Sequence, residues 1–225
     1  MAGTPEGRAF VAATRSLGTE VIEADLRIDD PPALSFRAGQ WISVPLAPKT
    51  VRAYSMASTP RSTSVITLCA DVAPAGPGSR WFRGLVPGAE VSFKGPLGGF
   101  VVDRADPRRP FFVAEEVGIV PIRSMLLDLH ETGFEDHATL VYWARDRDWL
   151  IYDDDFQDLA RRAPRFRYCP VVGGTVADAV TRLAPDVNGL VAYVAGGAAT
   201  INAAREVLMA RGLDRKSVKW EKFYG

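Results

Sequence analysis

The pattern of apolar residues changes at about residue 105, and this change constrains the fold more than any other feature of the sequence. Up to that point short β-rich runs alternate with turn residues, whereas beyond it apolar strands alternate with helical patterns. Residues 103–110 (DRADPRRP), between the two patterns, are polar, charged and proline-bounded, as interdomain linkers are. We therefore expect two domains, over residues 1–104 and 108–225.

The first domain is predicted to be a small antiparallel β-barrel, because its short strands are separated by frequent turn signals. The expected strands cover residues 9–13, 19–27, 41–45, 52–56, 64–70 and 89–94. Residues 17–28 mix strand and helix signals, so the second of these strands is the least clearly defined.

The second domain is predicted to be an α/β doubly wound parallel sheet, because strands and helices alternate along it. The expected strands cover residues 111–114, 138–143, 165–171, 189–195 and 217–220. The expected helices cover residues 121–131, 154–162, 176–183 and 201–210. Ligands bind such sheets outside the carboxyl ends of the strands. The turns at 114–121 and 195–199 are therefore candidate ligand sites.

The composition is that of a globular protein without a charge bias. The 27 Lys and Arg residues balance 27 Asp and Glu residues, so no overall field favours a nucleic acid or an anionic membrane. We see no apolar stretch suited to a signal peptide or a membrane span, and we therefore expect a cytoplasmic protein without membrane insertion. Cys69 and Cys169 are too few for an iron–sulfur cluster, and the two histidines are not clustered, so no metal site is expected.

Residues 52–55 (RAYS) place a cation, an aromatic ring and a hydroxyl within four positions. On an extended segment Arg52 and Tyr54 share one face, and Ser55 points to the other unless the backbone turns. A bound flavin needs such groups: a charge for its phosphates, a flat partner for its ring, and a hydrogen bond at its redox edge. On its own, however, the segment is more simply interpreted as an ordinary strand that ends in a Ser-Thr-Pro turn.

A glycine-rich segment follows at residues 74–82 (PAGPGSRWF). Gly76 and Gly78 allow backbone amides to approach an anion closely. A short helix is expected to begin near Ser79, and its N-terminus would offer N–H groups to a phosphate. On its own this segment is also compatible with a plain loop.

In combination and in this order, the motifs resemble those of the ferredoxin–NADP reductase family of flavoprotein oxidoreductases, over nearly the whole chain. The resemblance implies that Arg52 contacts the flavin diphosphate, that Tyr54 stacks on the isoalloxazine ring, and that Ser55 lies near N5 of the flavin. It places three residues in the family's second phosphate loop: Gly76, Gly78 and Ser79. Residues 95–100 (GPLGGF) resemble the segment that closes the barrel domain.

The C-terminal segment of residues 220–223 (WEKF) also resembles the family's last strand. The resemblance implies that Glu221 and Phe223 approach the flavin and the nicotinamide. Ser55 and Glu221 are then the expected catalytic residues. Because the sequence has no cysteine set for a ferredoxin module, we expect a stand-alone reductase module.

The nicotinamide side departs from the family at two places. The family usually has Gly-Gly-Thr-Gly after the first α/β strand, where this chain has Glu115, Glu116, Val117 and Gly118. It usually has a Cys where this chain has Ala195, which precedes Gly196. Two carboxylates at a helix N-terminus stabilise the helix through their interaction with its dipole. They also oppose a diphosphate, because like charges about 4 Å apart repel by about 1 kcal/mol in water.

Arg145, after the second α/β strand, has two possible roles. Its side chain could face an adenosine phosphate, or it could pair with Asp146 or Asp148. The sequence does not decide between these roles.

The resemblance implies an FAD-dependent oxidoreductase. Such a protein transfers electrons through flavin N5 between NAD(P)H and a redox partner protein, an oxygenase or a small-molecule acceptor. The alternative is a repurposed flavoprotein of the same fold that has lost NAD(P)H binding and acts on another substrate or within a larger complex. A scaffold that binds no flavin is a third hypothesis. The sequence leaves open NADH, NADPH or neither, FAD or FMN, the electron acceptor, and the oligomeric state.

Overall fold

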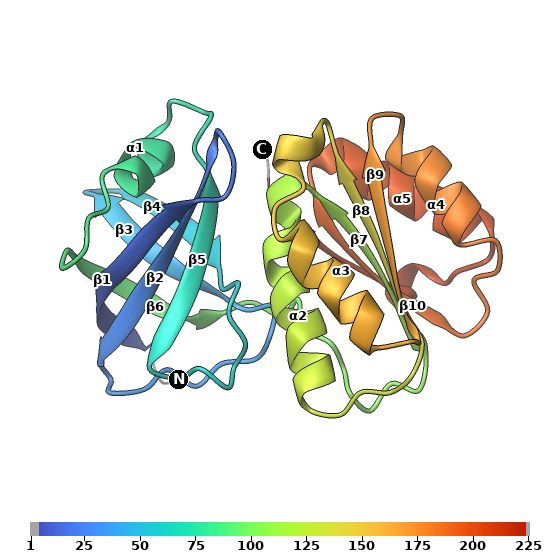
Figure 1. Ribbon diagram of the computed structural model, residues 1–225, viewed down its shortest axis with the longest axis horizontal. Helices are drawn as coiled ribbons and strands as arrows, with labels where there is room; N and C mark the ends of the chain where they lie inside the picture. The colour runs from blue at the N-terminus through green and yellow to red at the C-terminus, as the bar shows by residue number, and fades with distance from the viewer. Residues whose placement is uncertain (1–4, 224–225) are drawn as a thin grey trace. The chain divides into compact units, whose positions relative to one another are not determined.

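The computed structural model describes residues 5–223, which form two compact units (Figure 1). The first unit contains the described chain up to Val102 together with Arg123–Asp128. The second contains Asp103–Ile122 and the described chain from Leu129 onward. Each unit has its own hydrophobic core.

The first unit is built on a six-stranded antiparallel sheet with the strand order β4-β3-β6-β1-β2-β5. The strands are β1 (Glu6–Ser16), β2 (Val21–Asp30), β3 (Trp41–Ala47), β4 (Thr50–Ser55), β5 (Val65–Asp71) and β6 (Glu90–Leu97). The two outer strands meet just after β4, where Met56 forms an antiparallel bridge with Leu68 of β5. Beside it, the Ala57 N–H donates to the Thr67 carbonyl at 2.7 Å. The sheet is therefore closed into a barrel.

The barrel interior follows from the alternation of apolar residues along the strands. Ile42 and Val44 of β3 and Ile66 and Leu68 of β5 are at most 1% exposed, as alternate residues on an inward face should be. Between β5 and β6 lies the short helix α1 (Pro77–Arg83), with proline at its first position. Phe82 of this helix is 1% exposed and anchors α1 in the barrel core.

The second unit is a five-stranded parallel sheet with the strand order β11-β10-β7-β8-β9. Its strands are β7 (Arg109–Glu115), β8 (Ala138–Ala144), β9 (Phe166–Val172), β10 (Leu190–Gly196) and β11 (Val218–Lys222). Its helices are α2 (Ile119–Glu131), α3 (Asp153–Arg162), α4 (Val176–Leu183) and α5 (Ala198–Ala210), and the short turns η1 (Glu116–Gly118), η2 (Arg147–Trp149) and η3 (Arg215–Ser217) are 3₁₀ helices. The chain advances from β7 to β9 in one direction and then returns to the other side of β7. The order therefore reverses between β7 and β10, which is the topological switch point of the sheet.

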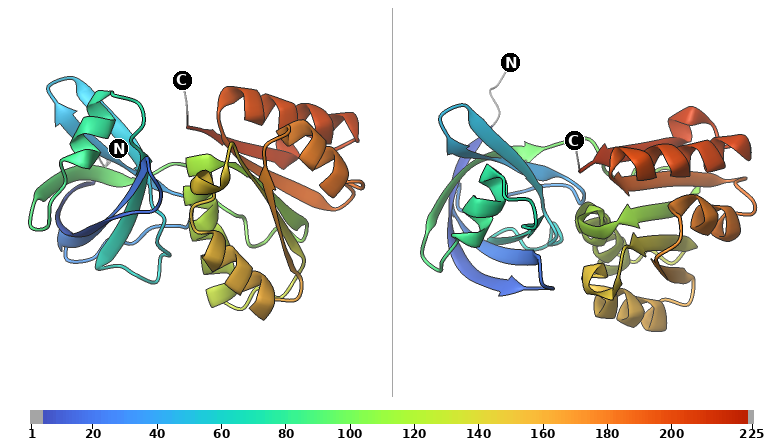
Figure 2. Two further views of the ribbon diagram at one scale, coloured as in Figure 1. Left: turned by 45° about the horizontal axis from the view of Figure 1, so that its top comes forward. Right: turned by 90° about the horizontal axis from the view of Figure 1, so that it is seen from above.

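Helices cover both faces of this sheet (Figures 1 and 2). Helices α4 and α5 share one core with Val141 and Val194 of the sheet. On the opposite face Phe156 of α3 packs against Tyr142 and Tyr168, with ring centroids 6.3 and 5.5 Å away. Strands buried on both faces are expected in a parallel sheet.

The predicted fold class is confirmed: an antiparallel β-barrel precedes a doubly wound α/β sheet. The ambiguous region around residues 17–28 belongs to strands and their connection rather than to a helix. Asp153 and its two acidic neighbours lie in the first turn of α3, where their charges are favourable to the helix dipole, and the N-cap is Tyr152, in a left-handed conformation with φ of 60°.

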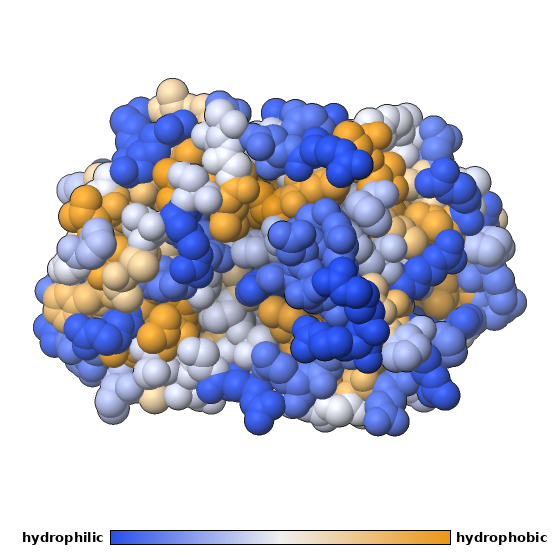
Figure 3. Space-filling view, in the orientation of Figure 1, coloured by the Kyte–Doolittle hydropathy of each residue, from blue (hydrophilic) through white to orange (hydrophobic). Residues whose placement is uncertain are grey.

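One face of the molecule is mixed in character. The face drawn in Figure 3 intersperses hydrophilic and apolar residues, in keeping with the balanced charge of the chain. Among residues 5–223, no helix has both the length and the apolar character needed to cross a membrane.

Candidate functional site

The RAYS segment forms the end of β4, paired with β3 on one side. Tyr54 pairs with Ile42, and Ser55 pairs with Trp41. Arg52 is exposed, whereas Tyr54 and Ser55 are 8% and 6% exposed. Both of these last residues are buried because β4 ends here, at the seam where the barrel closes. Arg52, Tyr54 and Ser55 therefore lie on one short strand segment.

The glycine-rich loop reaches this segment from α1. A Cβ atom added to Gly78 would lie 3.2 Å from the Tyr54 hydroxyl and 3.4 Å from Cγ of Arg52. The glycine therefore allows the start of α1 to lie directly against both side chains. Gly76 is the N-cap of α1, and a Cβ atom added to it would meet open space. Within the described residues, no side chain caps this helix. Ser79, in its first turn, is 8% exposed.

This donor set fits a cofactor with a diphosphate and a flat ring. An exposed guanidinium, the backbone amides at the start of α1 and an aromatic side chain meet at one place. The fit rests on the first unit alone, in which Arg52, Tyr54, Ser55, Gly76, Gly78 and Ser79 all lie.

Tyr54 has an aromatic neighbour that the sequence did not reveal. Its ring stacks on Trp81 of α1, with centroids 5.3 Å apart and planes 29° apart, and it also packs against Phe82. Burial raises the pKa of the Tyr54 phenol to about 12, although the nearby Arg52 charge acts in the opposite direction. The phenol therefore stays protonated at neutral pH. The predicted stacking of Tyr54 on a flavin stays a prediction, and Trp81 is a second aromatic side chain at this place.

The second candidate site lies at the carboxyl ends of β7 and β10, at the switch point. Glu115 ends β7, and its Oε2 accepts a hydrogen bond of 2.5 Å from the Gly197 N–H. Gly197 is the N-cap of the 13-residue helix α5. The carboxylate therefore occupies a helix N-terminus, a position that attracts anions. As expected, Glu115 stands at the start of the helical segment that follows β7, as the N-cap of η1, but its side chain does not cap that turn and reaches the start of α5 instead.

Glycines bring the backbone close at this point. A Cβ atom on Gly118 would lie 2.4 Å from the Ala195 carbonyl oxygen, and one on Gly196 would lie 2.7 Å from Oε2 of Glu115. Gly118 therefore serves the packing of η1 against β10. Val117 beside it is buried, at 5% exposure.

The C-terminal strand joins the same group. Ala195 pairs with Glu221, and the Phe223 N–H donates to the Gly196 carbonyl at 2.9 Å. The structure thus brings Glu115, Gly196 and Phe223 together within the second unit. Ser55, the other predicted catalytic residue, belongs to the first unit.

Glu116 and Arg145 form a bidentate ion pair. Nε and Nη2 of Arg145 each donate to one Glu116 carboxylate oxygen at 2.6 Å. The Glu116 side chain is 4% exposed, and the Arg145 side chain is 52% exposed. The Arg145 guanidinium also lies over the Trp149 ring, 4.1 Å from its centroid. Glu116 is not one of the two acidic partners expected for Arg145, which were Asp146 and Asp148.

Two contributors were missed as site residues: Trp81 and Trp149. They contact Tyr54 and Arg145 because of the way α1 and η2 are rotated, which a sequence pattern does not give. Gly197 lies in the turn at residues 195–199, which the sequence marked as a candidate ligand site.

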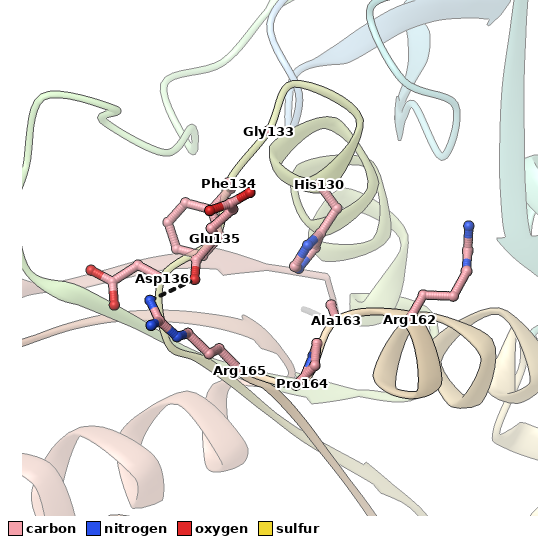
Figure 4. Close-up of a pocket in the computed structure, with 9 residues that line it drawn as sticks. All are labelled: His130, Gly133, Phe134, Glu135, Asp136, Arg162, Ala163, Pro164 and Arg165. Atoms are coloured by element: carbon pink, nitrogen blue, oxygen red, sulfur yellow. Dashed lines mark hydrogen bonds between the residues drawn. The ribbon is translucent and has the colours of Figure 1, made fainter.

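A cavity of about 440 Å³ lies elsewhere in the second unit, where β8 and β9 begin. His130, Arg162 and Arg165 line it, and the Arg165 guanidinium donates to the Glu135 carbonyl at 3.2 Å (Figure 4). Burial, and then the charge of Arg162, lower the pKa of His130. The cavity is at the amino edge of the sheet, opposite the turns that hold Glu115 and Arg145.

The barrel sequence matches a known protein family. Residues 9–102 match the family model described as "Oxidoreductase FAD-binding domain". Ferredoxin–NADP reductase B of Sorangium cellulosum is 35% identical over 163 residues, which cover 71% of this chain and 67% of that protein. The phenol hydroxylase P5 protein of Acinetobacter pittii is 28% identical over 231 residues, covering 96% of this chain and 65% of that protein. The chain thus spans about two thirds of the length of these relatives.

Solved structures establish the fold over the whole chain. The Amycolatopsis cytochrome P450 reductase GcoB has a TM-score of 0.89 at 22% identity, covering 100% of this chain and 72% of its own. The flavohem-like FAD/NAD-binding domain of nitric oxide dioxygenase from Vibrio cholerae has a TM-score of 0.85 at 18% identity, covering 97% of this chain and 99% of its own. Together with the barrel match and the 35% identical relative, this architecture shows that the chain belongs to the ferredoxin–NADP reductase family of flavoprotein oxidoreductases.

Proposed function

We propose that the protein is an FAD-dependent reductase that transfers electrons between NAD(P)H and a redox partner protein, an oxygenase or a small acceptor. The observation that carries this proposal is the junction of β4 and α1, where Gly78 lies against Arg52 and Tyr54. The relatives support the direction of transfer, since several are reductase components of oxygenases by name. The cytoplasmic location stays a prediction from the sequence.

FAD, when bound, supplies a group that accepts two electrons with a hydride and releases them one at a time. Arg52 is proposed to hold the diphosphate through charge-assisted hydrogen bonds, which are stronger than neutral ones. The backbone of Gly76, Gly78 and Ser79 would complete this phosphate site. Tyr54, with Trp81 behind it, would provide the aromatic wall for the ring.

The remaining predicted roles are proposals on the same basis. Ser55 would donate a hydrogen bond near the redox edge, and Glu221 and Phe223 would act beside the nicotinamide. We propose residues 1–104 as the FAD-binding domain and residues 108–225 as the NAD(P)-binding-like domain. Val117 and Gly118 belong to η1 of this second domain, and Ala195 lies near the end of its strand β10.

A second function is favoured by one observation. The Glu115 carboxylate already accepts the Gly197 N–H at the start of α5. A dinucleotide diphosphate that approaches the same helix N-terminus meets a negative charge. A flavoprotein that receives electrons from another donor is therefore the alternative.

The decisive experiment is a spectroscopic one on the purified protein. FAD is expected to co-purify or to rebind, and to bind more tightly than FMN. Anaerobic titration with NADH and with NADPH then separates the two functions, because only the reductase bleaches the flavin absorbance. A colourless protein that takes up no FAD at high micromolar concentration would refute both.

Arg52→Ala tests the phosphate contact. Losing a hydrogen bond to a charged group costs roughly 1.5–3 kcal/mol of binding free energy, so FAD affinity should fall at least about tenfold. Arg8→Ala is the matched control, since Arg8 is an exposed arginine of the same barrel that pairs with Asp29. Equal FAD affinity in the two variants would show that Arg52 does not contact the diphosphate.

A further inference from the structure

The Glu116–Arg145 pair lies where the sheet should receive a nucleotide. Glu116 follows β7 directly, and Arg145 follows β8 directly, and these two strands are neighbours in the parallel sheet. In sheets of this kind a nucleotide binds outside the carboxyl ends of the strands. An arginine at such an edge accommodates the 2′-phosphate of NADPH, whereas an acidic residue favours NADH. Here both residues are present, and they bind each other.

The Glu116 pair engages one edge of the Arg145 guanidinium, and the planar faces of the group make different contacts. Two donors on one edge of the guanidinium bind the Glu116 carboxylate at 2.6 Å each. One face of the same group covers the Trp149 ring at 4.1 Å. The Arg145 side chain is 52% exposed beside these contacts, and a guanidinium is a planar, delocalised cation that can stack on flat rings.

Glu116 is fixed in place by its own backbone. Its φ of 47° lies in the left-handed region, which residues other than glycine rarely adopt. The buried Tyr142 hydroxyl lies 3.2 Å from the Glu116 carbonyl oxygen and 2.9 Å from the Trp149 carbonyl oxygen. Tyr142 thereby ties together the backbones of Glu116 and Trp149, the two residues that contact the Arg145 guanidinium.

A hollow of about 380 Å³ lies at the turn after the neighbouring strand, β9. Gly173 lines it together with Asp178 and Arg182 of α4. The Gly173 N–H donates to the Ala144 carbonyl at 3.1 Å, one residue before Arg145.

We propose that Glu116 is a specificity-determining residue that makes the second unit select NADH and reject NADPH. By satisfying Arg145, Glu116 withholds the guanidinium from a 2′-phosphate and adds a negative charge that opposes it. Arg145 then contributes by stacking on the adenine rather than by pairing with a phosphate. This inference rests on the proposed use of NAD(P)H.

Direct binding to the FAD-loaded protein tests the proposal without turnover. The probes are ADP-ribose and its 2′-phosphorylated form, measured by isothermal titration calorimetry. The wild-type protein should bind ADP-ribose at least about tenfold more tightly. Glu116→Gln, which keeps the size and one acceptor but removes the charge, should lower that ratio at least about tenfold. The ratio of kcat/KM for flavin reduction by NADH and NADPH should shift in the same direction.

Two further variants show that the effect belongs to Arg145. In the double variant Glu116→Gln/Arg145→Met the gain for the 2′-phosphorylated probe should disappear. Asp106→Asn removes another bidentate arginine pair of the same unit, in which Arg108 donates to Asp106 at 2.8 and 2.6 Å. This matched control should leave the probe ratio unchanged.

The outcomes separate this inference from the proposed function. If wild type binds the 2′-phosphorylated probe as tightly as ADP-ribose, or if folded Glu116→Gln keeps the wild-type ratio, the inference is wrong and the reductase function stands. If ADP-ribose binds selectively but neither nucleotide reduces the flavin, the inference stands and the reductase function is wrong. If neither probe binds and neither nucleotide reduces the flavin, both are wrong.

Discussion

Glu115→Gln should increase the rate at which NADH reduces the flavin. In the wild-type protein the Glu115 carboxylate accepts the Gly197 N–H at 2.5 Å, at the N-terminus of α5. A diphosphate carries two negative charges, and each repels a carboxylate about 4 Å away by about 1 kcal/mol in water. Removing the carboxylate charge should therefore make nucleotide binding more favourable by ~2 kcal/mol. Salt screens part of this gain, so the affinity should rise at least about tenfold.

The same substitution should cost little stability. Glutamine retains an oxygen that can accept the Gly197 N–H, so only the charge-assisted part of the hydrogen bond is lost. That part is about 1 kcal/mol, the difference between typical charged and neutral hydrogen bonds. A loss of helix-dipole stabilisation of 0.3–1 kcal/mol lies within the same range.

The assay is anaerobic stopped-flow bleaching of the flavin absorbance over a series of NADH concentrations, with urea unfolding as the check on stability. Glu206→Gln is the matched control, since Glu206 is an exposed glutamate further along the same helix. Replacing Glu115, Glu116 and Val117 by Gly, Gly and Thr should raise the rate further. Rapid reduction of the wild type at micromolar NADH, with no gain in the single or triple variant, would refute the electrostatic argument.

Three more perturbations follow from the geometry. Tyr54→Phe should change FAD affinity less than threefold, because the hydroxyl has only a 3.5 Å contact with a backbone oxygen, whereas Tyr54→Leu should weaken binding and shift the flavin spectrum if the ring faces the cofactor. Gly118→Ala should destabilise the protein by about 1–3 kcal/mol in urea unfolding, because its Cβ would lie 2.4 Å from a carbonyl oxygen, while Gly99→Ala, with open space, should be near neutral. The pKa of His130 is lowered in the folded protein, so the unfolded chain takes up the proton at a higher pH. The stability that neutral His130 contributes above pH ~6.5 should therefore be lost as the pH falls toward the folded-state pKa. Between pH 7.5 and 5.5 the melting temperature should fall less for His130→Gln than for the wild type or the exposed control His137→Gln.

The fold was predictable because its signals are local. Alternating apolar residues marked the barrel strands, and the change to strand–helix alternation marked the second sheet. The boundaries of α1 and β11, for example, differ from the predicted ones by only a few positions. Strand order was not predictable in this way. The adjacency of β7 and β10, which brings Glu115 to Gly197 across 82 positions, depends on how the chain returns to the sheet.

The side-chain contacts at the candidate sites were harder to predict from the sequence, for a related reason. The RAYS residues were identified because they are consecutive, and the structure places them on one segment. The pair of Glu116 and Arg145 spans 29 positions and depends on a left-handed backbone that glutamate rarely adopts. The contact of Trp81 with Tyr54 depends on which way a seven-residue helix is rotated. Such geometry follows from tertiary packing, and single-sequence patterns do not contain it.

The seam of the barrel has a consequence for the lifetime of the protein. The strand with Arg52 ends at the bridge between Met56 and Leu68, and the chain with Gly78 leaves from the far end of β5. A cofactor held at both places would link the two sides of this closure. A ligand at a thousand times its Kd stabilises the folded state by about 4 kcal/mol. The supply of flavin would then set how fast proteases remove the chain, so the amount of protein would follow the amount of cofactor.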